Sequence, residues 1–143
     1  MLKLQTNYLA AIQRHGEQSY PVEACGLLVG INRGDVREVR AAFPCANASA
    51  GSPQIHYAID PAEVARIQRQ TREHGWEIVG IYHSHPDHPA MWSPTDLADA
   101  CWTLCSYVIT SIDQGKAVAT RSFVLTGTGE DDKAFVAEEI VLE

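Results

Sequence analysis

Two histidines and an aspartate near the middle of the chain have the residue types and the spacing of a catalytic metal site. His83 and His85 alternate in the apolar stretch WEIVGIYHSH (residues 76–85), and Asp96 follows them. Alternate residues of a strand point to the same side, so both imidazoles can reach one ion. Two histidines and one carboxylate leave a tetrahedral position open for water, whereas structural zinc sites are more often closed and rich in cysteine.

Each part of this pattern also has an ordinary structural explanation. A His-x-His pair alone is a weak indication of a metal site. Ser93 and Asp96 form an S-x-x-D pattern that is typical of a capping box at the start of a helix, and this role requires no metal. The two roles of Asp96 are compatible, because a cap fixes the carboxylate in place.

The elements expected around these residues place them at one end of a strand. Residues 76–85 predict a central strand that Pro86 ends, since proline cannot donate a ladder hydrogen bond. Ser93 to Cys101 predicts a short capped helix. Asp96 then lies in the first turn of this helix, from which a carboxylate can reach back to the end of the strand.

The rest of the chain predicts an α/β fold in one domain over residues 1–143. A helix is expected to end near Gly16, and another to start at Asp60 with Glu63 completing a capping box and to stop at Gly75. Two or three helices and six or seven strands are expected, and they do not alternate regularly as in βαβ units. This order indicates a mixed, mostly antiparallel sheet. Besides residues 76–85, strands are expected over residues 24–31, 36–43, 54–58, 104–111, 118–125 and 134–142, with a small polar loop at 46–53.

Composition excludes several classes of function. The net charge of −7 argues against nucleic acid as a partner. No apolar run approaches the roughly 18 residues that predict a membrane span. The N-terminal stretch lacks the features of a signal peptide, so a cytoplasmic location is expected. The four cysteines form no CxxC pair and are expected to be reduced thiols: Cys25, Cys45, Cys101 and Cys105.

The complete set of polar residues resembles the metallopeptidase motif of the JAMM (MPN-plus, or Mov34/MPN/PAD-1) family. That motif is a glutamate just before a glycine-containing strand, then His-x-His, and after a fixed interval Ser-x-x-Asp. The similarity extends over most of the chain and implies a single MPN-type domain. Here the motif positions are Glu23, His83, His85, Ser93 and Asp96, with no departure in spacing.

The resemblance implies a role for each of these residues. His83, His85 and Asp96 bind one zinc ion, which lowers the pKa of a bound water towards about 7 and polarises the scissile carbonyl. Glu23 acts as general base and then as general acid. The hydroxyl of Ser93 helps to hold the water or the developing oxyanion. Without the motif, Glu23 is typical of a surface carboxylate before a strand.

The resemblance also implies a substrate. Short bacterial members similar to this chain cleave the amide bond after the C-terminal Gly-Gly tail of a ubiquitin-like sulfur-carrier protein, and release of cysteine in cysteine biosynthesis is the favoured reaction. A deconjugating isopeptidase and a non-catalytic MPN scaffold are the alternatives. Other zinc hydrolases fit less well, because HExxH and PCxxC motifs are absent and a TIM barrel needs roughly 200 residues. The carrier, the oligomeric state and the roles of His88 and Trp92 stay open.

Overall fold

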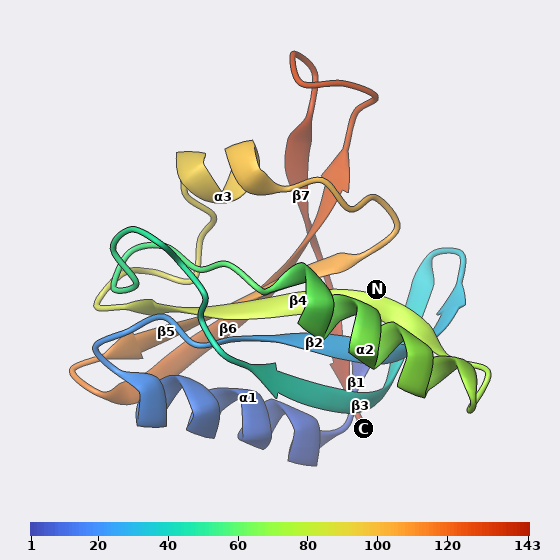
Figure 1. The fold of residues 1–143 in the computed structure, drawn as a ribbon, viewed down its shortest axis with the longest axis horizontal. Helices are drawn as coiled ribbons and strands as arrows, with labels where there is room; N and C mark the ends of the chain where they lie inside the picture. The colour runs from blue at the N-terminus through green and yellow to red at the C-terminus, as the bar shows by residue number, and fades with distance from the viewer.

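The computed structural model describes residues 1–143, and all of its strands belong to one mixed sheet (Figure 1). The order across the sheet is β7-β6-β5-β4-β2-β3-β1-β8. The elements along the chain are β1 (Leu2–Leu4), α1 (Thr6–Ser19), β2 (Cys25–Arg33), β3 (Val36–Cys45), α2 (Pro61–Arg72), β4 (Glu77–Pro86), α3 (Pro94–Asp99), β5 (Ser106–Asp113), β6 (Lys116–Thr126), β7 (Ala134–Glu138) and β8 (Ile140–Leu142).

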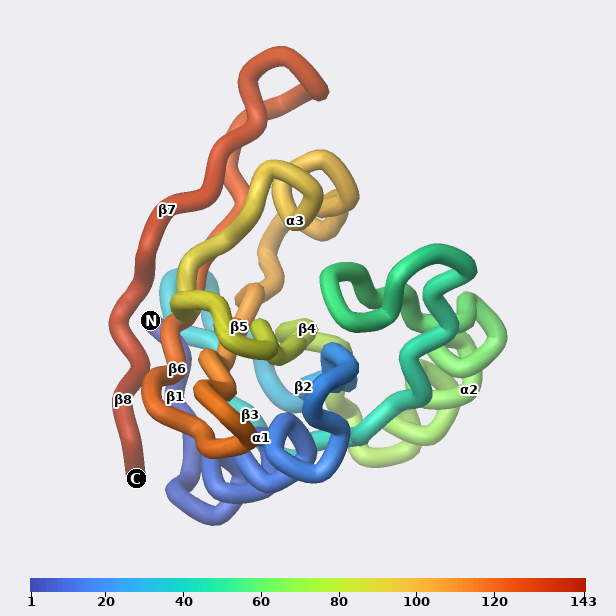
Figure 2. Tube along the Cα trace, turned by 90° about the vertical axis from the view of Figure 1, so that its left-hand side faces the viewer, coloured from blue at the N-terminus to red at the C-terminus, as the bar shows by residue number.

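Strand β2 is covered on both sides because its alternate side chains enter two different cores. Leu28 packs in one core with Ile12 of α1. Leu27 and Val29 pack in another core with Ile67 of α2. The two helices therefore lie on opposite faces of the sheet, with α1 at the bottom and α2 at the right of Figure 2. The apolar run of residues 24–31 correctly predicted this buried strand.

The last stretch of the chain joins the two edges of the sheet. β7 pairs with β6 at one edge, β8 pairs with β1 at the other, and only Glu139 lies between them. Figure 2 shows β7 and β8 as one continuous trace. Beside this junction the buried carboxylate of Glu138 accepts hydrogen bonds from Arg37 Nη2 at 2.8 Å and from Ser122 Oγ at 2.7 Å. These bonds tie the C-terminal stretch to the sheet.

Strand β4 lies in the interior of the sheet and carries the predicted histidines to its C-terminal end. It pairs antiparallel with β2 and parallel with β5, so Cys25 and Ile109 flank His83. Neighbours on both sides fix the backbone of the His-x-His pair. Helix α3, which carries Asp96, follows after a short loop, as the sequence predicts.

The predicted fold class is confirmed, although two of the strand predictions are wrong. Residues 54–58 form no strand, because the side chain of Asn47 binds the backbone of His56 and Ala58, where a partner strand would otherwise be needed. Residues 134–142 form two strands instead of one, because the chain passes from one edge of the sheet to the other. The three-residue strand β1 was not predicted at all.

The helix predictions need smaller corrections. Asp60 caps α2 by accepting a hydrogen bond from Ala62 N–H at 2.9 Å, as expected. Glu63 completes no capping box, because its carboxylate binds the guanidinium of Arg66 at 2.7 Å. Helix α1 continues past Gly16 to Ser19, α2 ends at Arg72 before Gly75, and α3 ends at Asp99 before Cys101. None of the helices combines the length and the apolar character needed to cross a membrane.

Candidate metal centre

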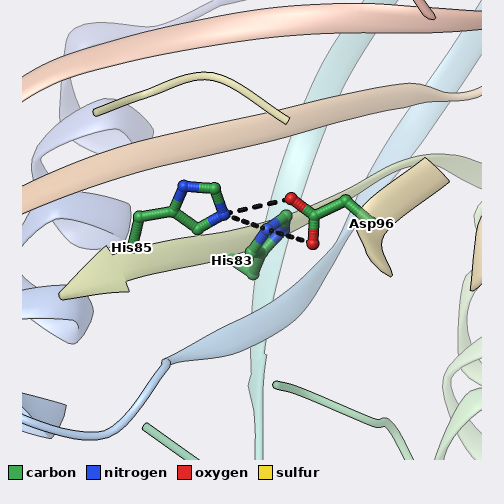
Figure 3. A group of neighbouring side chains, drawn as sticks. All are labelled: His83, His85 and Asp96. Atoms are coloured by element: carbon green, nitrogen blue, oxygen red, sulfur yellow. Dashed lines mark hydrogen bonds and ion pairs between the residues drawn. The ribbon is translucent and has the colours of Figure 1, made fainter. Parts of the chain in front are cut away.

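The side chains of His83, His85 and Asp96 meet at the end of β4 (Figure 3). Nε2 of His83 lies 3.1 Å from Nε2 of His85 and 3.3 Å from Oδ1 of Asp96. Oδ2 of Asp96 lies 3.1 Å from Nε2 of His85. Tetrahedral ligands at about 2.0–2.1 Å from a zinc ion are roughly 3.3 Å from one another. The three side chains therefore already have the spacing of a zinc ligand set.

The protonation of these groups also suits a metal ion. Nδ1 of His85 lies 2.9 Å from the carbonyl oxygen of Pro89. A ring nitrogen that faces a carbonyl carries the proton, so neutral His85 presents a lone pair at Nε2. This lone pair faces Nε2 of His83 and the carboxylate of Asp96. Electron-rich atoms that face one another need a cation between them, and two imidazoles with one carboxylate form a typical zinc donor set.

Burial and mutual contact shift the pKa values of the three groups. Burial lowers the pKa of His83, which is 1% exposed, and so favours the neutral form that binds metal. Burial also acts to lower the pKa of His85, but in the metal-free protein the Asp96 carboxylate can accept a hydrogen bond from protonated Nε2 and raises the pKa overall. A bound metal ion takes the place of that proton. Burial alone would raise the pKa of Asp96, yet hydrogen bonds with both histidines hold it well below its usual range. The aspartate therefore stays ionised.

Glu23 lies beside this cluster as a buried carboxyl group. It is 5% exposed, and its Oε1 has no hydrogen-bond partner. Burial raises the pKa of Glu23 to about 8. Its backbone is held in place from two directions: its N–H donates to Pro53 O at 2.8 Å, and the next N–H, of Ala24, donates to Ser84 Oγ at 2.8 Å. The carboxyl group is thus positioned by its backbone and is free to exchange a proton.

Ser93 and Asp96 form the capping box that their spacing predicts. Ser93 Oγ accepts a hydrogen bond from Asp96 N–H at 3.1 Å, and Oδ2 of Asp96 accepts one from Ser93 N–H at 2.9 Å. The capping bond uses the hydroxyl oxygen as an acceptor and leaves its proton available to a substrate. Both readings of the S-x-x-D pattern thus fit the same geometry.

Two cavities lie near the cluster of His83, His85 and Asp96. A cavity of about 480 Å³, here called the Glu23 pocket, is lined by Glu23, His85 and Ser93 together with apolar side chains. A second cavity of about 430 Å³, here called the Tyr57 groove, is mainly apolar. Tyr57 lines it and stacks on His83 with 4.3 Å between the ring centroids. His85 of the cluster therefore lines the Glu23 pocket directly, whereas the Tyr57 groove meets the cluster through Tyr57 alone.

All five motif residues come together, and the structure adds neighbours that the sequence does not reveal. His88 and Trp92, whose roles were left open, both line the Glu23 pocket. Asn47 Nδ2 donates to the backbone oxygen of Glu23 at 3.1 Å. Lys133 Nζ donates to the carbonyl oxygens at the end of α3. Neither residue belongs to a local motif, so the only sequence signal near Asn47 was the small polar composition of its loop.

Comparison with known proteins is consistent with this geometry. A desampylase from Haloferax volcanii is 40% identical over 93 residues, which cover 65% of this chain and 65% of the desampylase. A probable TtuB-protein conjugate cleaving protease from Thermus thermophilus is 32% identical over 87% of this chain and 76% of its own length. The CysO-cysteine peptidase of Mycobacterium tuberculosis is 29% identical over 97% of this chain and 93% of its own length. These names confirm the expectation of a hydrolase.

The fold and the family agree with these relatives. The solution structure of a protein from Desulfitobacterium hafniense matches with a TM-score of 0.85 and 35% identity, over 100% of this chain and 93% of that one. The family model for prokaryotic homologs of the JAB domain matches residues 5–126, which include every residue of the cluster and its neighbour Glu23. The chain therefore belongs to the family of prokaryotic homologs of the JAB domain, as the JAMM resemblance predicted.

Proposed function

We propose that the chain is a zinc-dependent peptidase that cleaves the amide bond after the C-terminal Gly-Gly tail of a ubiquitin-like sulfur-carrier protein. One observation carries the catalytic part of this proposal. His83, His85 and Asp96 direct electron-rich atoms at one point, and His85 lines the same cavity as Glu23, whose carboxyl oxygen Oε1 has no hydrogen-bond partner. This arrangement serves to hold a cation beside a group that moves protons.

The residues divide the work of hydrolysis between them. A zinc ion, when bound, supplies a Lewis acid and lowers the pKa of water. Glu23 takes a proton from the attacking water and returns it to the leaving amine. Burial raises the pKa of Glu23 to about 8, and a cation held at the cluster would lower it towards neutrality, where both transfers are favourable. Ser93 directs its hydroxyl proton at the charge that develops on the carbonyl oxygen. Burial of Glu23 and His85 limits bulk water around these steps.

The names of the relatives support a ubiquitin-like carrier as the substrate. They support two different leaving groups, namely free cysteine and a modified protein. The CysO-cysteine peptidase supports the predicted release of cysteine in cysteine biosynthesis. The desampylase and the TtuB-protein conjugate cleaving protease support removal of a modifier from another protein. A scaffold has no such support, because every motif residue is in place. For either reaction we propose a cytoplasmic enzyme with reduced thiols.

The proposal is tested with purified protein and a defined carrier. Bound zinc is measured, and cleavage is followed with a carrier that ends in Gly-Gly-Cys and one joined to a lysine. We expect a chelator to stop cleavage and added zinc to restore it. We expect Glu23→Gln to keep its zinc and to lose about 10²–10⁴-fold in kcat/KM. The exposed Glu73→Gln is the matched control. Cleavage by Glu23→Gln at the wild-type rate would contradict the assigned role of Glu23.

A further inference from the structure

We infer that Tyr57 is a positioning residue for the proposed metal ligand His83, because its ring takes over the task that a hydrogen bond performs at His85. The inference rests on the zinc-binding part of the proposed function and concerns a residue outside the five motif positions. Three observations carry it: the unpartnered ring nitrogen of His83, the ring of Tyr57 that stacks on it, and the contacts that hold Tyr57 in place.

His83 lacks the hydrogen bond that normally orients a metal-binding histidine. Its Nε2 faces the carboxylate of Asp96 (Figure 3), so Nδ1 carries the proton in the form that binds metal. This Nδ1 is buried and has no hydrogen-bond partner, whereas Nδ1 of His85 lies 2.9 Å from the carbonyl oxygen of Pro89. Ligating histidines almost always donate this second N–H group to a partner that fixes the ring. A contact other than a hydrogen bond must therefore orient the ring of His83.

The ring of Tyr57 lies nearly parallel to the ring of His83 and in contact with it. The two centroids are 4.3 Å apart, and the planes differ by 22°. The backbone of His83 is already held by its partners in β2 and β5, so contact across the ring face opposes the rotation that is left to the side chain. The contact also favours the metal-bound state. An imidazole takes on positive charge when a cation binds its Nε2, and the face of an aromatic ring attracts such charge within about 6 Å.

Tyr57 is held in place by its own packing and by the residue before it. Its side chain packs against the apolar core that contains Ile67 of α2. Nδ1 of His56 lies 2.7 Å from Ser49 Oγ, and Nε2 of the same ring lies 2.9 Å from Oδ2 of Asp99. Asp99 is the last residue of α3, the helix that also carries one of the three proposed ligands. The loop that bears Tyr57 is thus joined to this helix, so the stacked ring and the ligand set keep their relative positions.

Zinc affinity separates the ring of Tyr57 from its hydroxyl group. Metal-free protein is titrated with zinc in competition with a chromophoric chelator. We expect Tyr57→Leu to bind zinc about tenfold more weakly than the wild type, and Tyr57→Phe to bind within about twofold of it, because the ring is the part that stacks. Tyr57→Met is a second variant without an aromatic ring, for use if Tyr57→Leu does not fold. Wild-type affinity in a folded variant without the ring, or an equal loss in Tyr57→Phe, would overturn the inference.

Trp76→Leu is the matched control, because Trp76 also stacks on a histidine and packs against the same apolar core as Tyr57. Its ring centroid lies 4.6 Å from that of His74, with 20° between the planes. Trp76 precedes the first residue of β4, whereas the cluster lies at the other end of this strand. We expect Trp76→Leu to destabilise the metal-free protein about as much as Tyr57→Leu and to leave zinc affinity unchanged. An equal loss of zinc affinity in both variants would indicate general destabilisation and contradict the inference.

Cobalt(II) in place of zinc gives a spectroscopic signature of the ligand geometry. We expect the visible absorption bands of Tyr57→Phe to match those of the wild type. The bands of Tyr57→Leu are expected to shift or broaden, because the ring of His83 is no longer held in one orientation, and unchanged bands would contradict a positioning role. None of these measurements needs a carrier. A chain that binds zinc but cleaves no carrier would therefore refute the proposed reaction and leave the inference intact, whereas a wild type that binds no zinc would refute both.

Discussion

Replacing Asn47 by alanine tests whether the loop after β3 holds Glu23 in the position that we propose for catalysis. Asn47 Nδ2 donates to the carbonyl oxygens of Glu23 at 3.1 Å and His56 at 3.0 Å. Its Oδ1 accepts from the N–H groups of Ser49 at 3.0 Å and Ala58 at 3.2 Å. One amide side chain therefore connects the segment of Glu23 to three points of a loop that belongs to no β-strand pair.

The cost of losing Asn47 follows from these contacts. The amide group of Asn47 has two N–H donors, so its longer contact to Pro53 O at 3.4 Å competes with the two shorter donated bonds and is left out. Two donated and two accepted hydrogen bonds remain. Each is worth about 0.5–1.5 kcal/mol, and water replaces part of this because the loop is only half-buried. We expect Asn47→Ala to lower the free energy of unfolding by about 2–3 kcal/mol. For a chain of this size the Tm then falls by about 4–12 °C.

The same substitution separates catalysis from metal binding. Once the bond to the Glu23 carbonyl is lost, the carboxyl group shifts relative to the scissile bond, and a displacement of about 1 Å can cost about 100-fold in rate. The proposed ligands lie on β4 and α3, and none of the hydrogen bonds of Asn47 goes to them. We therefore expect kcat/KM to fall by about 10- to 100-fold while zinc affinity changes by less than about twofold.

Denaturant unfolding, zinc titration and carrier cleavage measure these three quantities. Asn32→Ala is the matched control, because Asn32 makes one exposed hydrogen bond, to Leu104 O at 3.2 Å. We expect this control to cost less than about 1 kcal/mol and to leave cleavage unchanged. The reasoning is refuted if Asn47→Ala destabilises the protein no more than Asn32→Ala, or if its kcat/KM equals that of the wild type.

Two further predictions concern the supports of the site. Lys133→Met removes an ammonium group that binds Ala98 O at 2.9 Å and Ala100 O at 3.1 Å, so α3 is held less firmly and zinc affinity is expected to fall by about two- to tenfold. Lys116→Met is the control, and equal affinities in the two variants would refute this role. In the metal-free protein, burial raises the pKa of Glu23 from 4.5 to about 8. The protonated carboxyl group therefore contributes fully to the stability of the fold below about pH 4.5, and this contribution is lost as the pH rises to about 8. Glu23→Gln is therefore expected to gain stability relative to wild type between about pH 5 and about pH 8.5 in urea unfolding, and a constant difference would contradict it.

The meeting of His83, His85 and Asp96 was predictable because local rules fix the positions of these side chains. The period of two along a strand places His83 and His85 on one side, and the capping box places Asp96 at the start of a helix. Both rules act over a few residues and leave little freedom to the backbone. The position of Glu23 beside them depends on the pairing of β2 with β4, which these rules do not specify, so it was accessible only through the family motif.

The supports of the site were not predictable because they come from distant segments. A strand was predicted over residues 54–58, yet Asn47 supplies the hydrogen bonds that a partner strand would have made. Lys133 reaches α3 from the β6–β7 hairpin, which in Figure 1 projects on the same side of the sheet as α3. Nothing in the composition around Lys133 distinguishes it from a solvated lysine. Such contacts appear only once the sheet has brought the segments together.

The double use of Asp96 explains how the site can be ordered before a metal binds. Its Oδ2 accepts the capping hydrogen bond from Ser93 N–H at 2.9 Å and also lies 3.1 Å from Nε2 of His85. The cap thus fixes the rotamer of the carboxylate at the place where the ligand is needed, and the entropy of ordering it is lost on folding rather than on metal binding. The hydrogen bonds that keep its pKa low also keep it ionised. A capping residue and a metal ligand are therefore not competing interpretations of this aspartate, because the first role prepares the second.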